Sequence, residues 1–479
     1  MRNTRKLKKL QKQMDNATSY DEWSEAAQEH DELTGEKRWR QVDHTRQYDY
    51  AQIRLRLDKL RSLRARHDYQ GLLFTLNEGI HGNMGGMGRH SLYSHAKFGT
   101  KVLIEQYIDE VDDSLRFLAE LQTDQISVQE KLDFFYRANI CFGRSALMLS
   151  GGGVLGFYHL GVVKTLLDQG LLPRVVSGSS AGSLVAGTLG THTDEELDRF
   201  YQPANVLTEA EREASAFTRM FFGANAQIDV GDLEKLIARM IPDLTFQEAY
   251  EKTGRQISIS VAPAELHQRS RLLNAITSPN VYVRSAVMAS CAVPGVFPPV
   301  MLMAKNQHGE RQPYLPTRKG RELLNFYRGM VQNRSETWPR FNMLMSSVHA
   351  LMDQEYSGDI NIVPKFRWYN PAKLLSHLSE KDLIALMEGG ERSTYPAVEA
   401  IRTCTKISRT MEEILNRFEQ GDLRPDKSEY HRPRSSRRRP PPTRADREAM
   451  REHRLHSGNI EKSSGSKIAA PQTKNAGQA

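Results

Sequence analysis

The stretch RVVSGSSAGSLVAG, residues 174–187, gives the strongest indication of the fold. This stretch combines a short apolar strand, a tight turn of glycine and serine, and the start of a helix of small residues. The turn contains a G-x-S-x-G pattern that begins at Gly178 and ends at Gly182. In such a strand-to-helix turn the serine hydroxyl is exposed at the edge of a sheet, so Ser180 is a candidate nucleophile. We expect Gly178 and Gly182 to let the turn close without a steric clash at Cβ.

A second glycine-rich turn precedes this one by 27 residues. The apolar run SALMLS (145–150) predicts a buried strand, and GFYHLGVVKTLLDQG (156–170) predicts a helix that ends at Gly170. Together with the apolar residues of LLPRVVS (171–177), they form a strand–helix–strand unit. Such a unit implies a parallel sheet.

We expect both turns to lie at one edge of this sheet, because neighbouring parallel strands end on the same side. The first turn offers the backbone N–H groups of Gly151, Gly152 and Gly153 at the start of a helix. Donors of this kind stabilise a developing oxyanion. With Ser180 at the second turn, the pair predicts an acyl-transfer site.

The same glycines also satisfy G-x-G-x-x-G, at Gly151, Gly153 and Gly156. A dinucleotide site would need an acidic residue at the end of the second strand to bind the ribose. The nearby Asp168 belongs to the intervening helix instead, and no Gly-Lys-Ser/Thr follows to make a phosphate loop. Both nucleotide interpretations are therefore disfavoured, and we expect no cofactor.

These residues resemble the patatin-like phospholipase family. SGGGVLGFYHLGV (150–162) corresponds to its oxyanion loop, SGSSAG (177–182) to its nucleophile turn, and MASCAVPGVFPPV (288–300) to its Ala/Ser-rich, Pro-containing segment. The helical N-terminal region resembles the domain of unknown function 3336, which precedes patatin-like cores in triacylglycerol-lipase relatives. The resemblance implies an α/β core with a mainly parallel sheet flanked by helices, preceded by a helical domain.

The resemblance also implies a Ser-Asp dyad, in which Ser180 attacks an ester carbonyl and an aspartate of an Asp-Gly pair acts as its base. The chain departs from this pattern. It contains no Asp-Gly dipeptide, it has no aspartate from Leu244 to Met352, and the strand expected to carry the pair is missing near residues 317–321. The dyad aspartate is thus not found. The nearest carboxylates that would have to replace it are Glu310, Glu322 and Asp359, and none of them precedes a glycine.

The histidines do not supply an obvious base either. A Ser-His-Asp triad of the α/β-hydrolase type needs a histidine downstream of the serine, and those after Ser180 have no loop context that suggests this role. We expect His159, in the helix after the glycine loop, to be structural. His81, His90 and His95 show no metal-ligand spacing, and we expect no metal site.

Changes in composition and hydrophobic periodicity along the chain predict four parts. Residues 1–140 form a helical domain, in which Ser127 and Glu130 have the spacing of a capping box. Residues 141–320 form the α/β core, with a further strand at QISISVAP (256–263). Residues 321–422 form a helical extension interrupted by GDINIVP (358–364), and residues 423–479 form a disordered tail.

The net charge of +8 resides entirely in this tail. Residues 424–479 hold 14 Lys and Arg against 6 Asp and Glu, so residues 1–423 carry 52 charges of each sign. The tail is rich in Pro, Arg and Ser and too poor in apolar residues to form a core. We expect a solvated basic tail, with contact to an anionic lipid surface or to RNA as the alternatives, and no specific nucleic-acid partner.

The remaining composition predicts a cytoplasmic protein, peripheral at a membrane or lipid droplet if attached. The start, MRNTRKLKKLQKQM, lacks the apolar run of an export signal, and no stretch has the length of a bilayer span. The three cysteines, Cys141, Cys291 and Cys404, lie far apart, as in a reducing compartment.

We therefore expect a serine acyl-ester hydrolase acting on triacylglycerol or phospholipid. The apolar cluster FTRMFFGA (217–224) is a candidate lid for acyl chains, with core packing as the alternative. Because the dyad aspartate is not found, a catalytically inactive lipid-binding or scaffold protein with the same fold remains the second hypothesis.

Overall fold

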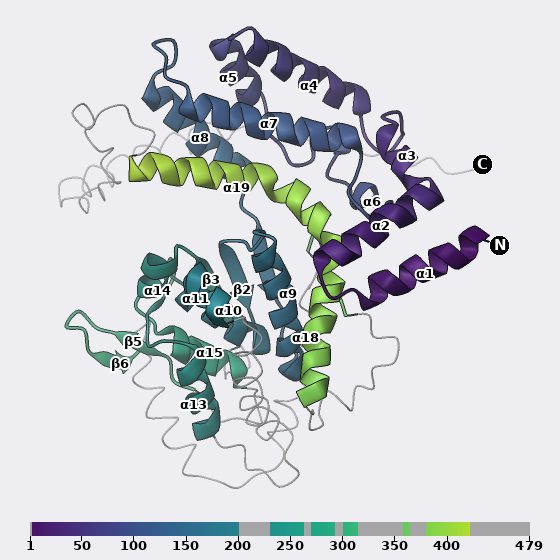
Figure 1. Cartoon of the computed structure of the whole chain (residues 1–479). Helices are drawn as coiled ribbons and strands as arrows, with labels where there is room; N and C mark the ends of the chain where they lie inside the picture. Colours follow the sequence, from purple (N-terminus) through teal and green to yellow (C-terminus); the bar gives the residue numbers. More distant parts are fainter. Residues whose placement is uncertain are drawn as a thin grey trace, which may run out of the picture. The chain divides into compact units, whose positions relative to one another are not determined.

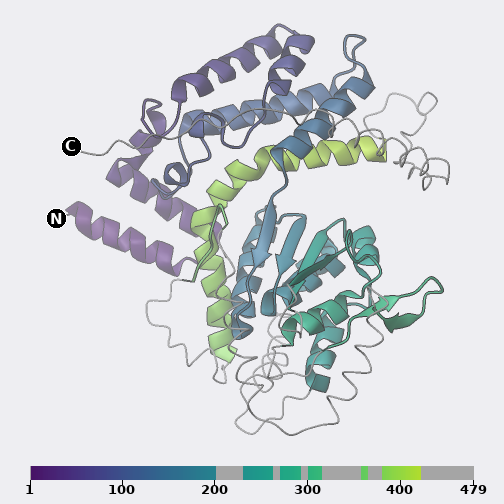
Figure 2. The same ribbon diagram turned by 180° about the vertical axis from the view of Figure 1, so that it is seen from behind.

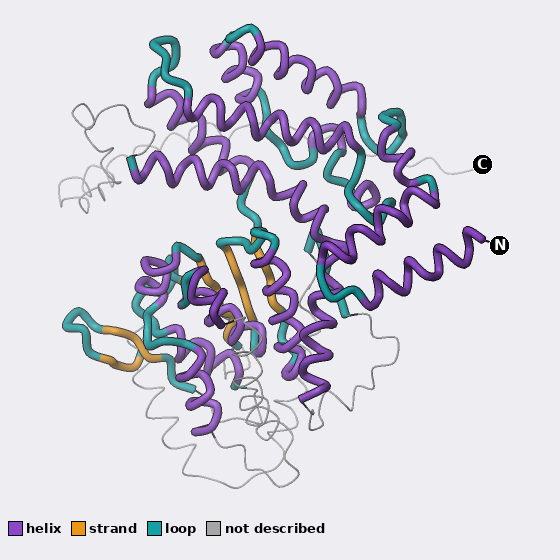
Figure 3. Tube along the Cα trace, viewed as in Figure 1, coloured by secondary structure: helices purple, strands orange, loops and turns teal. Residues whose placement is uncertain are grey.

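The computed structural model describes residues 2–200, 230–262, 270–292, 300–314, 358–364 and 380–421. All of these residues belong to one compact unit, Met1–Leu423. The candidate lid at 217–224, the segment 315–357 with the expected Asp-Gly position, and the basic tail lie outside the described residues. Figures 1 and 3 show the described elements in colour.

The N-terminal region is helical, as predicted. Several of its helices are preceded by a capping residue, whose side chain accepts a hydrogen bond from a free backbone N–H of the first turn. Ser127, for example, accepts from the backbone N–H of Glu130. Asp49 and Asp68 do the same for the helices that follow them. The helices are α1 (Arg2–Asn16), α2 (Tyr20–Thr34), α3 (Glu36–Gln41), α4 (Tyr50–Ala65), α5 (Tyr69–Asn77), α6 (His90–Tyr93), α7 (Val102–Glu120) and α8 (Val128–Phe142).

The core of this region includes a helix from the far end of the chain. Helix α19 (Val398–Gln420) packs against α7 and α8. Its Met411 and Phe418 are buried in the same cluster as Leu57 of α4 and Phe135 of α8. The helices from α4 to α8 therefore share their hydrophobic core with α19.

The central sheet has four strands in the order β1-β2-β3-β4. The strands are β1 (Ala146–Leu149), β2 (Val175–Gly178), β3 (Gln256–Val261) and β4 (Arg271–Asn274). The first three are parallel, and β4 runs antiparallel to β3. Figure 2 shows β1 to β3 side by side. The prediction of an α/β fold with a mainly parallel sheet is confirmed.

Helices follow the strands as the strand–helix–strand pattern requires. Helix α10 (Ala181–Thr191), directly after β2, is buried along its whole length and packs on β2 and β3. The other helices of this region are α9 (Gly156–Asp168), α11 (Asp194–Phe200), α13 (Val230–Met240), α14 (Phe246–Thr253) and α15 (Val283–Cys291). A hairpin of β5 (Met303–Lys305) and β6 (Arg311–Pro313) follows α15, and β5 and β6 form a separate two-stranded sheet.

Helix α18 (Glu380–Thr394) lies against α9 at a very short distance. A β-carbon on Gly161 of α9 would lie 1.9 Å from the carbonyl oxygen of Met387, and one on Gly390 would lie 2.2 Å from that of Tyr158. The two backbones approach this closely only because glycine occupies both positions. In the described part of the chain, no helix is both long and apolar enough to cross a bilayer.

Candidate active site

The site is organised by the carboxyl ends of β1 and β2. In the parallel register Leu149 pairs with Gly178, so the glycine turn after β1 and the serine turn after β2 leave the sheet together. A β-carbon placed on Gly151 would lie 3.4 Å from the β-carbon of Ser180. The N–H of Ser179 also donates to the carbonyl oxygen of Leu149 at 3.2 Å, so the serine turn lies directly beside the end of β1.

Ser180 adopts a backbone conformation that is rare for a residue with a side chain. Its φ is 50° and its ψ is −121°, and it lies between the last residue of β2 and the first turn of α10. Among the described residues other than glycine, only His67 shares a positive φ. Such a conformation costs about 1–3 kcal/mol and persists where the surroundings enforce it, which is frequent at functional sites.

The glycines of the turn leave no room for a side chain. A β-carbon on Gly178 would lie 2.1 Å from the carbonyl oxygen of Gly182, and one on Gly182 would lie 2.2 Å from that of Leu149. Helix α10 therefore begins almost in contact with the end of β1. Any larger residue at either position would push the serine turn away from the glycine turn.

The glycine turn after β1 depends on glycine for a different reason. Gly152 and Gly153 have φ values of 151° and 56°, which side chains disfavour. The segment Gly153–Leu155 forms a short 3₁₀ turn that continues directly into α9. The backbone amides of this loop consequently lie at the start of a helix, where the helix dipole favours negative charge.

His159 fastens the glycine turn to α9. Its Nε2 lies 2.9 Å from the carbonyl oxygen of Ser150, which only accepts, so Nε2 carries a proton and donates. Burial lowers the pKa of the imidazole below its usual value of 6.5, while the bond to Ser150 opposes this shift. A neutral ring that donates to a carbonyl supports the structural role predicted for His159.

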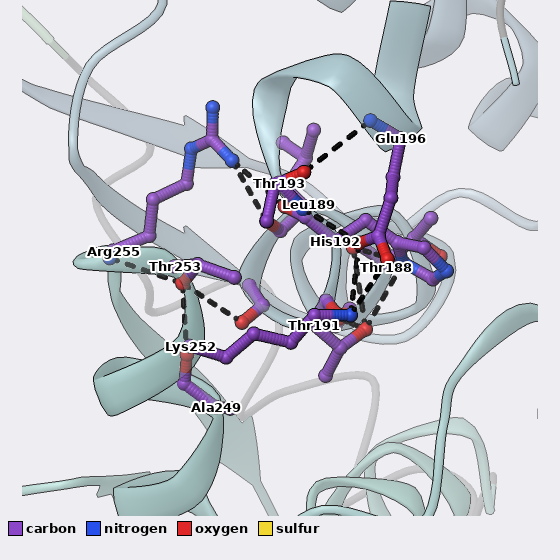
Figure 4. Close-up of polar contacts among 12 residues, drawn as sticks. Thr188, Leu189, Thr191, His192, Thr193, Glu196, Ala249, Lys252, Thr253 and Arg255 are labelled. Atoms are coloured by element: carbon purple, nitrogen blue, oxygen red, sulfur yellow. Dashed lines mark hydrogen bonds and ion pairs between the residues drawn. The ribbon is translucent and has the colours of Figure 1, made fainter. Parts of the chain in front are cut away.

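The other end of α10 is stabilised by two cations (Figure 4). Arg255 donates from Nη1 to the carbonyl oxygens of Leu189 and His192, at 3.2 and 3.0 Å. Lys252 donates from Nζ to the carbonyl oxygen of Thr191 at 3.0 Å. Positive charge at the carboxyl end of a helix complements its dipole. Helix α10 is therefore fixed at both ends, with Ser180 at its amino end.

The residues that the structure describes show no general base bonded to Ser180. Among the described residues, no hydrogen bond joins its Oγ to a carboxylate or an imidazole. Glu310 lies at the turn of the β5–β6 hairpin, where its Oε2 accepts from Asn306. Asp359 is exposed, and its charge adds to the effect of burial, which is the main cause of the raised pKa of the Cys404 thiol in α19. Glu322 lies outside the described residues.

Two residues that sequence reasoning did not single out contact the backbone of Ser180. Ser183 Oγ donates to its carbonyl oxygen at 2.6 Å, and Ser290 Oγ accepts from its N–H at 2.9 Å. Ser290 falls within the Ala/Ser-rich segment 288–300. The pattern gave no indication of which side chain in that segment turns toward Ser180.

A glycine turn and a strained serine turn at adjacent strand ends of an α/β sheet are typical of hydrolases that use a serine nucleophile. Comparison with known families is consistent with this class. Residues 1–139 match the family described as "Domain of unknown function (DUF3336)", and residues 147–308 match "Patatin-like phospholipase". The chain belongs to the patatin-like phospholipase family.

The chain is similar in sequence to proteins named as triacylglycerol lipases. "Triacylglycerol lipase ptl3" of Schizosaccharomyces pombe is 30% identical over 453 residues, which cover 81% of this chain and 93% of that protein. "Triacylglycerol lipase 4" of Saccharomyces cerevisiae is 31% identical over 473 residues, which cover 83% of this chain and 52% of that protein. "Triacylglycerol lipase SDP1L" of Arabidopsis thaliana is 37% identical over 303 residues, 63% of this chain and 37% of that protein.

The chain thus spans only about half of the S. cerevisiae relative and about a third of the A. thaliana one. A solved structure, "Crystal structure of type III effector protein ExoU (exoU)", is 14% identical with a TM-score of 0.28 and covers 68% of this chain and 67% of that chain. At that score the similarity carries no argument.

Proposed function

We propose that this chain is a lipid acyl-ester hydrolase of the triacylglycerol-lipase or phospholipase type, with Ser180 as its nucleophile. The observation that carries the proposal is the strained conformation of Ser180 beside the glycine turn. Membership of the patatin-like family and the names of its relatives support a lipid ester as substrate.

The chemistry begins with attack of Ser180 Oγ on the ester carbonyl carbon, which forms a C–O bond and moves an electron pair onto the carbonyl oxygen. The backbone N–H groups of Gly151, Gly152 and Gly153 stabilise this oxyanion. Collapse expels the alcohol and leaves an acyl-serine, which water then hydrolyses. The serine proton must pass to a base, which then gives it to the oxygen of the departing alcohol, and no described residue is assigned that role.

The second candidate function, a catalytically inactive lipid-binding protein, is favoured by one specific observation. The chain has no Asp-Gly pair, and the patatin-like match ends at residue 308, before the position expected for it. Loss of a general base removes about 10²–10⁴-fold of the rate. A remaining oxyanion site still leaves some acceleration over the uncatalysed reaction.

A fluorophosphonate probe distinguishes the two candidates, because it phosphonylates an activated serine without the later hydrolysis step. We expect labelling of the full chain at Ser180, located by peptide mass spectrometry, and none in Ser180→Ala. Ser285→Ala is the matched control, because it removes a hydroxyl that bonds to the backbone of Tyr282 and Met303 and not to that of Ser180. A folded chain that is not labelled supports the inactive lipid-binding protein. Release of fatty acid from triacylglycerol or phospholipid emulsions, compared with Ser180→Ala, then measures turnover.

We also propose peripheral contact with a lipid surface, through the apolar cluster 217–224 and the basic tail. Flotation with liposomes tests this contact. Replacing both Phe221 and Phe222 by Ser should reduce the bound fraction, and unchanged flotation would remove the lid from the proposal.

A further inference from the structure

The backbone of Ser180 is held on both sides by two consecutive residues of α15. The N–H of Ser180 donates to Ser290 Oγ at 2.9 Å, although the two residues are 110 positions apart in the chain. The thiol of the next residue, Cys291, contacts the carbonyl oxygen of Ser180 at 3.5 Å. The carboxyl end of α15 therefore contacts both polar groups of the strained residue.

The direction of the Ser290 hydroxyl is fixed by a third partner. Ser290 Oγ donates to the carbonyl oxygen of Ser260 in β3 at 2.7 Å. A hydroxyl has one proton to donate, so its lone pairs are left to accept from the Ser180 N–H. The result is a directed chain of hydrogen bonds from Ser180 N–H through Ser290 to β3. This chain ties the serine turn to a strand other than the one that precedes it.

The hydrogen bond also determines what the Ser180 amide can do. An N–H that donates to Ser290 is not directed toward a substrate oxygen. Among the described groups considered for this role, the N–H groups of the glycine turn after β1 remain as the proposed oxyanion donors. The Ser290 hydroxyl in turn compensates the conformational cost of the positive φ, since a residue in such a region persists only when its surroundings enforce it.

We propose that Ser290 is a positioning residue for Ser180: its hydroxyl holds the serine turn in the conformation that places the Ser180 side chain beside Gly151. This inference rests on the proposed role of Ser180 as nucleophile. Ser290 does not touch the reacting atoms and acts only through the backbone of Ser180.

The test compares Ser290→Ala with two further variants in the full chain. Ser290→Thr keeps a hydroxyl at the same position. Ser285→Ala is the matched control. Ser285 is a buried serine of the same helix, and its Oγ donates to the carbonyl oxygen of Tyr282 at 2.8 Å and accepts from the N–H of Met303 at 3.1 Å. It therefore loses comparable hydrogen bonds away from Ser180.

Two measurements are made on each variant. The first is fluorophosphonate labelling of Ser180 over a range of probe concentrations, which separates the maximal labelling rate from the concentration for half-maximal rate. The second is residue-resolved hydrogen exchange of the Ser180 amide. In Ser290→Ala we expect the maximal rate to fall by about 10–100-fold, because a small misplacement of a reacting group has effects of this size. The half-maximal concentration should stay unchanged, and amide exchange should accelerate.

We expect Ser290→Thr and Ser285→Ala to be labelled at the wild-type rate. A wild-type maximal rate in Ser290→Ala overturns the inference, as does an equal loss in Ser285→Ala, which would indicate general destabilisation. If the wild-type chain itself is not labelled, the proposed function fails, and the exchange measurement decides separately whether Ser290 holds the turn. Unchanged exchange of Ser180 in Ser290→Ala would overturn that structural claim as well.

Discussion

At the scale of single residues, the surroundings of Ser180 impose a backbone conformation that is unfavourable by itself. Two glycines admit the turn, and hydrogen bonds from Ser183 and to Ser290 fix it. Beside it, His159 holds the glycine turn through the carbonyl group of Ser150. From these surroundings we predict the effect of His159 protonation on stability and the reactivity of Cys291. Neither prediction depends on which residue acts as the general base.

His159 should make the stability of the chain depend on pH. Its pKa is lowered in the folded state, so between the folded value and about 6.5 the unfolded chain binds the additional proton. The contribution of His159 is fully present above about pH 6.5 and is lost as the pH falls toward the folded pKa, by at most about 1.4 kcal/mol per pH unit. Urea denaturation between about pH 7 and pH 5 should show a shallower loss in His159→Gln, which retains a donor for Ser150 and does not titrate. Parallel curves for the two proteins would contradict this prediction.

The cysteines should differ sharply in reactivity. Burial raises the pKa of Cys291 to about 12, whereas Cys141 is exposed. Because the thiolate is the reactive form, iodoacetamide at about pH 8 should modify Cys141 and leave Cys291 intact in the folded chain. Peptide mass spectrometry measures both sites, and a urea-unfolded sample provides the control in which both react. Equal modification in the folded chain would mean that the end of α15 opens readily.

At the scale of elements, the segments that the sequence predicts well are those with local signals. The strand–helix–strand unit, the strand at 256–261 and the cap at Ser127 all follow from patterns within a few residues. Contacts between distant segments have no such signal. Ser290 and Ser180 meet only because β3 and α15 adjoin β2 and α10 in space, and the close approach of α18 to α9 depends on single glycines among otherwise ordinary helices.

The pair Gly389 and Gly390 in α18 tests that close approach. A β-carbon on Gly389 meets no atom within 4 Å, while one on Gly390 would lie 2.2 Å from the carbonyl oxygen of Tyr158. Gly389→Ala should raise the free energy of unfolding by about 0.5–1 kcal/mol through helix propensity. Gly390→Ala should lower it by about 1–3 kcal/mol or more, since α18 must move away from α9. Chemical denaturation of both variants gives the comparison, and equal effects at the two positions would rule out the packing described here.

At the scale of the whole molecule, sequence boundaries and packing boundaries do not coincide. The sequence suggests a helical region up to residue 140 and a separate helical extension after residue 321, and these boundaries remain predictions. In the structure, α19 from the second part lies in the core of the first. Polar contacts also join α7 and α19: Arg116 of α7 forms an ion pair with Glu413, and Thr410 donates to Asp112. No local pattern in either segment indicates its partner.

Phe418 should therefore control the stability of the N-terminal helices. Its ring is 1% exposed and lies 5.9 Å from the ring of Phe135. Phe418→Ala should lower the free energy of unfolding by about 3–5 kcal/mol, as expected for a buried aromatic residue. Phe74 of α5, which is 63% exposed, is the matched control, and Phe74→Ala should have little effect. If the two variants unfold at the same urea concentration, α19 does not complete the helical core.

The position of α19 also has a consequence for synthesis on the ribosome. Helix α8 ends at Phe142 and α19 begins at Val398, so the N-terminal helices emerge long before the segment that completes their core. At about 5–20 residues per second, this interval lasts on the order of tens of seconds. During that time the apolar faces of α7 and α8 are without one of their native partners. The nascent chain is therefore a substrate for chaperones that bind exposed apolar surface, until translation delivers its last described helix.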